Sequence, residues 1–321
     1  LGEVFAEAGA RTGGCALGSV KSQIGHTKCA AGLAGLIKTT LALYTGVTPP
    51  TLHLGRPNPA WTEDDSPFAF HTEARPWARP AGERFAGVSA FGFGGTNFHA
   101  VLAAHGDAVP PRQTLDEWPA ELFLFRARDE QSAHRQAAEL LEAAEADGRP
   151  WRLRDLALAA AHRADTSREA VQLAFVAQDM GQLTERLRAV LDQDGDTDVR
   201  RSDPVAGKVA FLFPGQGSQR TGMLAELLVA LPELRDHLQP DQADVVYPPA
   251  AFDDTARERR RTALTDTRAA QPALGAAGLA AHAFLGAAGV QPDLAAGHSY
   301  GELVALAAAG ALDPDTLPRL S

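Results

Sequence analysis

Ser299 stands between two glycines in the sequence Gly297-His298-Ser299-Tyr300-Gly301. The residues before it predict a short strand, and the apolar period after it predicts a helix over Glu302–Ala311. A serine on so sharp a strand-to-helix turn is exposed as a nucleophile, and the helix N-terminus, with the N–H of Tyr300 first, can stabilise an oxyanion. A serine hydroxyl also needs a base to take its proton. His298 adjoins the serine, but neighbours on such a bend point apart, so we do not expect it to be that base.

A second motif follows the apolar strand expected over Val209–Phe213. It reads Pro214-Gly215-Gln216-Gly217-Ser218-Gln219, and its glycines let another backbone approach closely. Gln216 therefore lies where an amide donor could form a second oxyanion contact. The alternative is a tight turn whose glutamines are solvated.

A third motif, Gly18–Thr27, places Lys21 and His26 five residues apart across a glycine turn. A histidine N–H could stabilise an enolate there, while the lysine holds the surrounding hydrogen bonds. The alternative is a solvated loop lysine and a turn histidine. Thr27 is expected to cap a helix of small residues, Lys28 to about Tyr44, that ends near Gly46.

Gly92–Asn97 is a glycine-rich loop between expected strands at Phe85–Phe91 and Phe98–Ala103. Because strands flank it on both sides, it does not match a dinucleotide-binding loop, which opens a helix. Cys15 and Cys29 form neither a disulfide framework nor a metal set. We expect both to be packed thiols in the core.

Composition limits the function. The 321 residues are 45% hydrophobic and carry a net charge of −10, which argues against a nucleic-acid partner. No run of about 18 apolar residues predicts a membrane span, and no leader is visible. Two cysteines suit a reducing compartment, so we expect a cytoplasmic protein without bound metal. The chain starts inside an expected helix, and both ends look cut.

The middle of the chain follows a change of composition at Asp107–Trp118 and predicts a compact α/β pattern without chemistry-bearing clusters. Its expected strands and helices are Leu122–Arg126, Asp129–Ala146, Leu153–Ala161, Val171–Ala177 and Gln182–Asp192. Beyond it we expect helices near Gly222–Ala230 and Ala269–Ala288 and a strand at Asp293–Ala296. A run of four arginines, Arg257 and Arg259 to Arg261, is either a solvated helix face or a docking surface for an acidic partner.

Together these motifs resemble a known family. Residues from about Lys208 onward are similar to the malonyl-type acyltransferase domain of fatty-acid and polyketide synthases, including Gln271-Pro272-Ala273-Leu274 and Gly297–Glu302. The resemblance implies that Ser299 takes an acyl group from coenzyme A, with Gln216 and the Tyr300 amide as oxyanion hole. The acyl group then passes to the phosphopantetheine thiol of an acyl carrier protein. The family's histidine base and carboxylate-binding arginine are expected after Ser321.

Residues 1–104 resemble the C-terminal part of a β-ketoacyl synthase. Lys21 and His26 match that family's lysine and second histidine, while Gln23 replaces a frequent asparagine. Phe93, in the glycine-rich loop, would gate acyl entry. The family's nucleophilic cysteine and first histidine have no counterpart here. Neither Cys29 nor Cys15 has the expected glycine elbow.

We therefore predict an α/β internal piece of a type I polyketide synthase, closest to the iterative polyunsaturated-fatty-acid and enediyne type. Its expected parts are the end of a thiolase-like ketosynthase (1–104), a small α/β linker domain (105–207) and the start of an α/β-hydrolase-like acyltransferase (208–321). The parent would condense malonyl units by decarboxylation and load them from malonyl-CoA, binding no cofactor of its own. Its partners would be the carrier protein, the rest of the synthase and a second copy through the ketosynthase, and the piece alone would be inactive.

Two other functions stay open at this point. A serine esterase of the α/β-hydrolase type would use Ser299, but it needs an acid and a histidine after the serine. Only Asp313 and Asp315 follow, without a later histidine. The other alternative is a scaffold without catalysis, in which residues 105–207 hold two domains at a fixed spacing.

Overall fold

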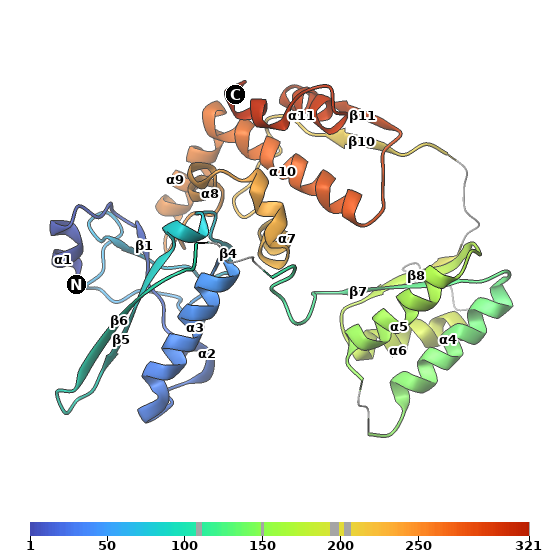
Figure 1. The fold of residues 1–321 in the computed structure, drawn as a ribbon, viewed down its shortest axis with the longest axis horizontal. Coiled ribbons are helices and arrows are strands. Elements are labelled where there is room, and N and C mark those ends of the chain that lie inside the picture. The colour runs from blue at the N-terminus through green and yellow to red at the C-terminus, as the bar shows by residue number, and fades with distance from the viewer. Residues whose placement is uncertain (107–110, 149–150, 193–198, 202–206, 321) are drawn as a thin grey trace. The chain divides into compact units, whose positions relative to one another are not determined.

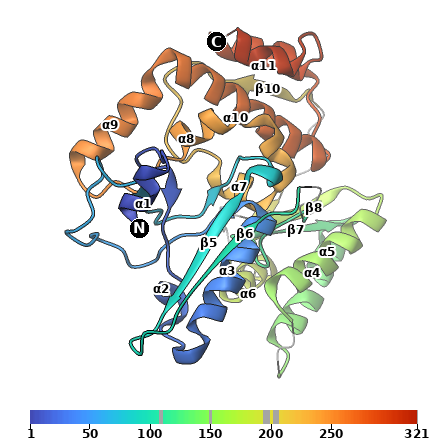
Figure 2. The same cartoon turned by 60° about the vertical axis from the view of Figure 1, so that its left-hand side comes forward.

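The computed structural model describes residues 1–106, 111–148, 151–192, 199–201 and 207–320. They form two compact units (Figures 1 and 2). One joins Leu1–Thr114 to Lys208–Ser321, and the other is Leu115–Gly207. The expected change of composition at Asp107–Trp118 falls partly on residues 107–110, which lie outside the described residues.

The unit formed by Leu115–Gly207 is one antiparallel sheet covered by helices. Its strands follow the order β7, β8, β9, and their bounds are Glu121–Arg126, Val171–Ala177 and Arg200–Arg201. Its helices are α4 (Glu130–Glu145), α5 (Leu153–Thr166) and α6 (Met180–Leu191). These elements agree with the predicted pattern, except that α5 runs five residues beyond the expected Ala161.

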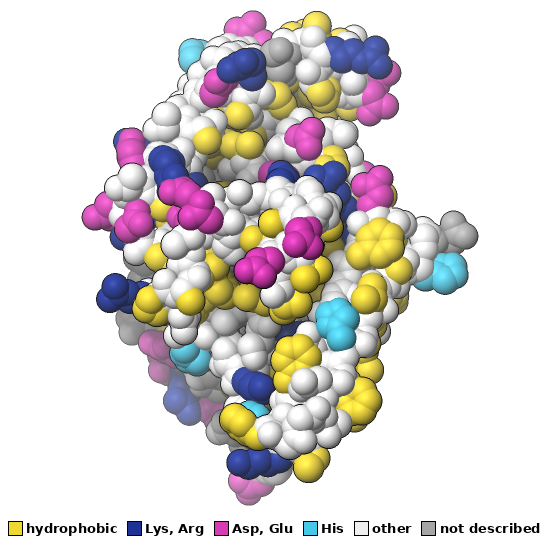
Figure 3. All heavy atoms as spheres, turned by 90° about the vertical axis from the view of Figure 1, so that its left-hand side faces the viewer, with side chains coloured by type: hydrophobic (Ala, Val, Ile, Leu, Met, Phe, Trp, Pro, Cys, Tyr) yellow, Lys and Arg dark blue, Asp and Glu magenta, His cyan; other side chains and the backbone are white. Residues whose placement is uncertain are grey.

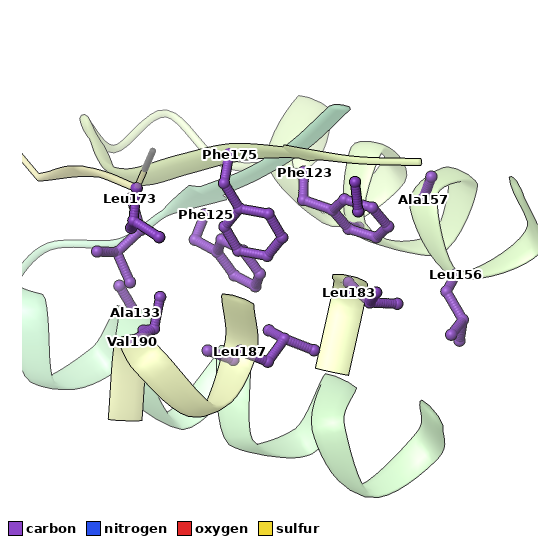
Figure 4. Packing of buried hydrophobic residues seen from close by; sticks show 14 of the residues in the cluster. Phe123, Phe125, Ala133, Leu156, Ala157, Leu173, Phe175, Leu183, Leu187 and Val190 are labelled. Carbon is purple, nitrogen blue, oxygen red and sulfur yellow. The ribbon is translucent and has the colours of Figure 1, made fainter. Parts of the chain in front are cut away.

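Alternate residues of β7 and β8 build the core of this unit (Figure 4). The rings of Phe123 and Phe175 stack with centroids 5.4 Å apart, and Leu183 and Leu187 of α6 are fully buried beneath the sheet. A two-residue side-chain period on the strands and a four-residue spacing on the helix place these groups on facing surfaces. All the buried residues described in this core are apolar.

The other unit begins with short elements around one helix and one hairpin. They are α1 (Gly2–Glu7), β1 (Cys15–Ala16), α2 (Lys21–Ile24), the 3-10 helix η1 (Lys28–Ala30), α3 (Ala31–Thr45), β2 (Val47–Thr48), β3 (Phe68–Ala69), β4 (Arg75–Pro76), the 3-10 helix η2 (Ala81–Glu83), β5 (Phe85–Phe91) and β6 (Asn97–Ala103). The two-residue strands pair as β1 with β3 and β2 with β4, and β5 pairs with β6 along its whole length.

Helix α3 packs against β5 through its glycines. A Cβ added to Gly32 would come within 2.8 Å of the Ala90 Cβ, so only glycine fits that contact. The small residues of this helix therefore let β5 approach it closely. The expected cap is wrong in detail: Thr27 makes no capping bond, and a 3-10 turn precedes α3, which ends at Gly46 in the left-handed conformation as predicted.

The rest of this unit surrounds two parallel strands (Figure 1). Its elements are β10 (Ala210–Phe213), α7 (Ala225–Ala230), the 3-10 helix η3 (Pro232–His237), α8 (Pro240–Val246), α9 (Asp254–Thr265), α10 (Thr267–Ala287), β11 (Leu294–Gly297), α11 (Tyr300–Ala308) and the 3-10 helix η4 (Pro314–Arg319). The side chains of Phe213, Leu274, Tyr300 and Val304 form a core between the strands, α10 and α11. The register sets Phe213 opposite Gly297, which brings the ends of β10 and β11 together.

Contacts distant in sequence join the early and late segments of this unit. Arg235 is only 7% exposed, and its guanidinium donates to the carbonyls of Thr45 and Gly46 at 2.6 and 2.8 Å. The backbone N–H of Ala250 donates to Phe70 O at 2.7 Å. Among the described residues, none of the helices has the length and apolar character needed to cross a bilayer.

Candidate active site

Ser299 occupies a strained turn between β11 and α11. Its backbone has φ 55° and ψ −124°, and it is one of the few non-glycine residues at positive φ. Such a conformation costs on the order of 1–3 kcal/mol and persists only where its surroundings enforce it. Here the enforcing bonds run from Gly301 N–H to His298 O (2.9 Å) and from His298 N–H to Phe213 O (3.1 Å). The predicted nucleophile elbow is therefore present as a backbone geometry, with the serine exposed.

The glycines on either side of Ser299 are required by packing. A Cβ on Gly297 would overlap the carbonyl of Gly301, and a Cβ on Gly301 would overlap the carbonyl of Phe213. Both overlaps are with backbone atoms, which cannot move aside as a flexible side chain could. The pattern of two glycines around the serine thus has two physical causes in this fold: the tightness of the turn itself at Gly297 and the close approach of β10 at Gly301.

The loop after β10 lies against the same turn. A Cβ on Gly215 would come within 3.0 Å of both the Ser299 Cβ and the His298 Nδ1. The carboxyl ends of parallel strands meet at one edge of a sheet, which is where ligands bind in open α/β sheets. The structure thus brings together two motifs that are about 80 residues apart, and Gly215, one of the glycines expected to let another backbone approach closely, makes the contact.

In the described structure, the side chain of Gln216 makes no hydrogen bond to Ser299. Its Nε2 donates to Thr265 O at 3.4 Å and to Thr267 Oγ1 at 3.3 Å, where α9 ends and α10 begins. Within the loop, Ser218 Oγ donates to Gly215 O at 2.8 Å. The side-chain amide is therefore engaged elsewhere, and the group of Gln216 that remains for an oxyanion contact is its backbone N–H.

Tyr300 begins α11 with its side chain in the core. The ring is 4% exposed, and its hydroxyl donates to Leu317 O at 3.0 Å. Only the backbone of Tyr300 is therefore placed for chemistry. The first turn of α11 directs N–H groups and the positive end of the helix dipole toward the serine.

Lys21 and His26 are both exposed, at the start of α2 and just after it. Gly25 turns the chain between them with φ 72°. His26 Nδ1 accepts the backbone N–H of Lys28 at 3.0 Å, and Lys28 itself is at positive φ. No hydrogen bond or ion pair joins Lys21 to His26 in the described part of the chain. Their convergence on one site stays a prediction.

Phe93 lies at the tip of the β5–β6 hairpin and is fully exposed. The expected glycine-rich connection is present: Gly92 N–H donates to Thr96 O at 3.0 Å, and strands flank the loop on both sides. The expectation for Cys29 is wrong, since its side chain is exposed. Cys29 lies in the 3-10 helix η1, before α3 begins, whereas Gly32 and Gly35 of α3 make the contact with the hairpin. Cys15 is half-buried, and burial raises the pKa of its thiol.

The arginine run lies on α9 and is neutralised by nearby carboxylates. Arg260 pairs with Glu63 at 2.9 Å and Arg259 with Asp64 at 3.0 Å. The other two, Arg257 and Arg261, pair within the helix. This agrees with the solvated helix face and leaves no bare basic surface for an acidic partner.

Three family models match this chain in sequence order. They are the beta-ketoacyl synthase C-terminal domain at residues 1–55, the ketoacyl-synthetase C-terminal extension at 57–168 and the acyl transferase domain at 210–316. The chain belongs to the polyketide synthase family. The acyl transferase match includes the Gln216 loop and the Ser299 elbow. The extension match runs across residue 104, and the predicted boundaries after 104 and 207 stay predictions.

Individual polyketide synthases show the same relationship. The chain is 36% identical to polyketide synthase GfsA of Streptomyces halstedii, over 92% of this chain and 4% of the relative. It is 36% identical to erythronolide synthase EryA3 of Saccharopolyspora erythraea, over 95% of this chain and 10% of the relative. The chain thus spans a small part of these relatives' length. The finer iterative subtype stays a prediction.

A solved structure shares the fold. The acyl transferase domain of ZmaA aligns with 64% of this chain and 48% of its own, with a TM-score of 0.53 and 22% identity. The α/β fold class predicted from the sequence is therefore confirmed. The family models add that a ketoacyl synthase segment and an acyl transferase segment lie in one chain.

Proposed function

We propose that Ser299 is the nucleophile of a malonyl-type acyltransferase. Its Oγ attacks the thioester carbonyl of malonyl-CoA, a C–O bond forms, and the C–S bond breaks as coenzyme A leaves. The proton of the serine ends on the coenzyme A thiol. A phosphopantetheine thiol of a carrier protein then attacks the ester and restores Ser299. The single observation that carries this proposal is the strained elbow at Ser299 within the matched acyl transferase segment.

The oxyanion of each tetrahedral intermediate would be stabilised by the backbone N–H groups of Tyr300 and Gln216. The side chains of both residues are engaged elsewhere, with Leu317 and with Thr265 and Thr267. Backbone donors fixed in place cost no reorganisation during the reaction, and one such donor contributes about 10²–10³-fold in rate. Gln216 therefore acts through its main chain in this proposal.

The ketosynthase part would use His26 and Lys21 in decarboxylative condensation. A backbone N–H can only donate, so the bond from Lys28 to His26 Nδ1 leaves the proton of neutral His26 on Nε2. That N–H is the donor an enolate oxygen needs when malonyl thioester loses carbon dioxide. Lys21 would support the hydrogen bonds around it, and Phe93 would gate the acyl channel.

The proposed partners are an acyl carrier protein, the other segments of the synthase and a second copy through the ketosynthase. Large apolar side chains of α3 and the hairpin support an interface on this side: Leu33, Ile37, Phe85, Phe91 and Val101 are all more than half exposed. Figure 3 looks onto the side that carries the hairpin and shows hydrophobic side chains among charged ones. Contiguous exposed apolar surface commonly marks a protein interface. We assign 1–104, 105–207 and 208–321 to ketosynthase, linker and acyltransferase.

Acylation of the serine tests the proposed function. The chain is incubated with malonyl-CoA, and peptide mass spectrometry looks for a malonyl ester on Ser299. Ser299→Ala should abolish the adduct, whereas Ser167→Ala, a remote serine in the other unit, should leave it unchanged. A malonyl ester that persists in Ser299→Ala, or one on another residue of the unsubstituted chain, would refute the assignment. Turnover of p-nitrophenyl acetate that depends on Ser299, without malonyl transfer, would favour the esterase alternative.

A further inference from the structure

We propose that Ser218 is a positioning residue for the acyltransferase site: it holds the carbonyl of Gly215 and thereby directs the backbone N–H of Gln216 toward the oxyanion. This proposal rests on the proposed function of Ser299. It adds a residue whose side chain touches neither the substrate nor the nucleophile.

The argument begins with the peptide unit between Gly215 and Gln216. A peptide group is planar and trans, so its C=O and N–H point in opposite directions. Any contact that fixes the carbonyl of Gly215 therefore fixes the direction of the Gln216 N–H. The plane can rotate about one dihedral angle on each side, ψ of Gly215 and φ of Gln216. Without a restraint, the N–H could turn away.

Ser218 supplies the restraint twice. Its Oγ donates to Gly215 O at 2.8 Å, and its backbone N–H donates to the same oxygen at 3.3 Å. The hydroxyl bond is the shorter of the two and lies within the ordinary range, whereas 3.3 Å is long for an N–H donor. The hydroxyl is thus the stronger of the two bonds.

Two other donors of this loop are already paired. Gly217 N–H donates to Gln219 Oε1 at 2.7 Å, and the Gln216 side chain donates to Thr265 and Thr267. Among the bonds of the described residues, none uses the Gln216 N–H as donor. The Gln216 N–H is therefore available to a ligand.

The peptide unit between Gly215 and Gln216 also lies close to Ser299. Gly215 is buried, and a Cβ on it would come within 3.0 Å of the Ser299 Cβ. The peptide unit that follows Gly215 therefore lies next to the turn that carries the nucleophile. A rotation of that plane would move an N–H donor relative to the oxyanion, and oxyanion stabilisation depends on donors being fixed in advance.

The test measures how fast a fluorophosphonate labels Ser299. In this reaction a bond forms between Ser299 Oγ and phosphorus while the P–F bond breaks, and fluoride and the serine proton leave. The phosphoryl oxygen takes the place of the oxyanion, so the maximal labelling rate reports the hole, and the half-saturating probe concentration reports binding. We expect Ser218→Ala to lower the maximal rate about tenfold, less than loss of a whole donor, with half-saturation and melting temperature unchanged.

Two variants separate positioning from general folding. Ser218→Thr keeps the hydroxyl and should restore the rate, and Ser167→Ala, a remote serine in the other unit, should label like the unsubstituted chain. If Ser218→Ala does not fold, Ser218→Cys, a nearly isosteric but weak donor, should fold and label more slowly. An unchanged maximal rate in Ser218→Ala or Ser218→Cys, or a loss in Ser218→Thr equal to that in Ser218→Ala, overturns the proposal. No labelling of Ser299 in the unsubstituted chain would instead refute the nucleophile, and the positioning role with it.

Discussion

Ser299 keeps its strained backbone because two neighbours have no side chain. A Cβ at Gly297 would overlap the carbonyl of Gly301 within the turn, and a Cβ at Gly301 would overlap the carbonyl of Phe213 at the end of β10. The strain at φ 55° is thus held by packing, and it directs the hydroxyl outward. The two glycines are therefore required for the geometry of the site, as the serine is for its chemistry.

Gly297→Ala should therefore damage both stability and reactivity. The added methyl group must displace the Gly301 peptide, which we expect to cost at least 1–3 kcal/mol, the usual range for overpacking. Labelling of Ser299 should fall by more than tenfold since the elbow moves. Urea unfolding and fluorophosphonate labelling measure the two effects. Gly55→Ala is the control, because a Cβ there meets nothing within 4 Å; equal behaviour of the two variants would contradict the packing argument.

At the scale of elements, the guanidinium of Arg235 binds carbonyls at the ends of two helices, α3 and α7. Arg235 Nη1 donates to Thr45 O and Gly46 O at the end of α3, while Nε and Nη2 donate to Leu228 O and Val229 O of α7 at 2.5 and 2.9 Å. The negative ends of both helix dipoles favour a cation there. Burial, with Arg84 nearby, nevertheless lowers the pKa of Arg235 to about 10. This residue joins the helix after His26 to the helix after the Gln216 loop.

Replacing Arg235 by Met should destabilise this unit by about 3 kcal/mol, because buried carbonyls lose their donor and each unpaired group costs about 1–3 kcal/mol. Arg235→Lys should recover part of the loss, since one ammonium reaches fewer carbonyls. Arg257→Met is the control: it removes an exposed pair within α9, which is worth well under about 1 kcal/mol. Urea unfolding compares the three, and similar losses for Arg235→Met and Arg257→Met would reject the role.

The sequence predicted those elements whose pattern is local. Local apolar and helix-forming patterns located β7, β8, α4 and α6 to within two residues. For helix α9 the sequence offered only a possible helix face at the arginine run, because few of its residues are apolar and its partners, Glu63 and Asp64, are about 195 residues away. For the same reason the partner of Gly215 could not be predicted from one motif, and the sequence did not show that Cys29 lies in an exposed turn before α3.

At the scale of the whole molecule, His71 lies where the early and late segments of the larger unit meet. Burial first, then the positive charges of Arg75 and Arg260, lower the pKa of His71 to about 4, and Asp244 opposes this shift. His71 Nδ1 and Arg75 Nε are buried without a hydrogen-bond partner in the described structure. A proton on His71 would therefore add a charge where two arginines already lie.

This environment makes the larger unit acid-sensitive before its carboxylates titrate. The folded pKa of about 4 lies below the ordinary histidine pKa of about 6.5, so between these pH values the unfolded chain binds a proton that the folded chain does not. Stability is therefore present above pH 6.5 and is lost as the pH falls toward 4. By pH 5 the expected loss relative to pH 7 is about 2 kcal/mol. Urea unfolding followed by hydrogen-exchange mass spectrometry measures it separately on peptides of each unit.

His71→Gln cannot titrate, so it should remove most of the pH dependence between pH 7 and 5 from the peptides of the larger unit. His162→Gln is the matched control, an exposed histidine of the other unit, and should leave that slope unchanged. The peptides of Leu115–Gly207 should follow the same pH profile in both variants, since His71 belongs to the other unit. A slope in His71→Gln equal to that of the unsubstituted chain would show that other groups cause the acid sensitivity, and His71 would then be a neutral packing residue.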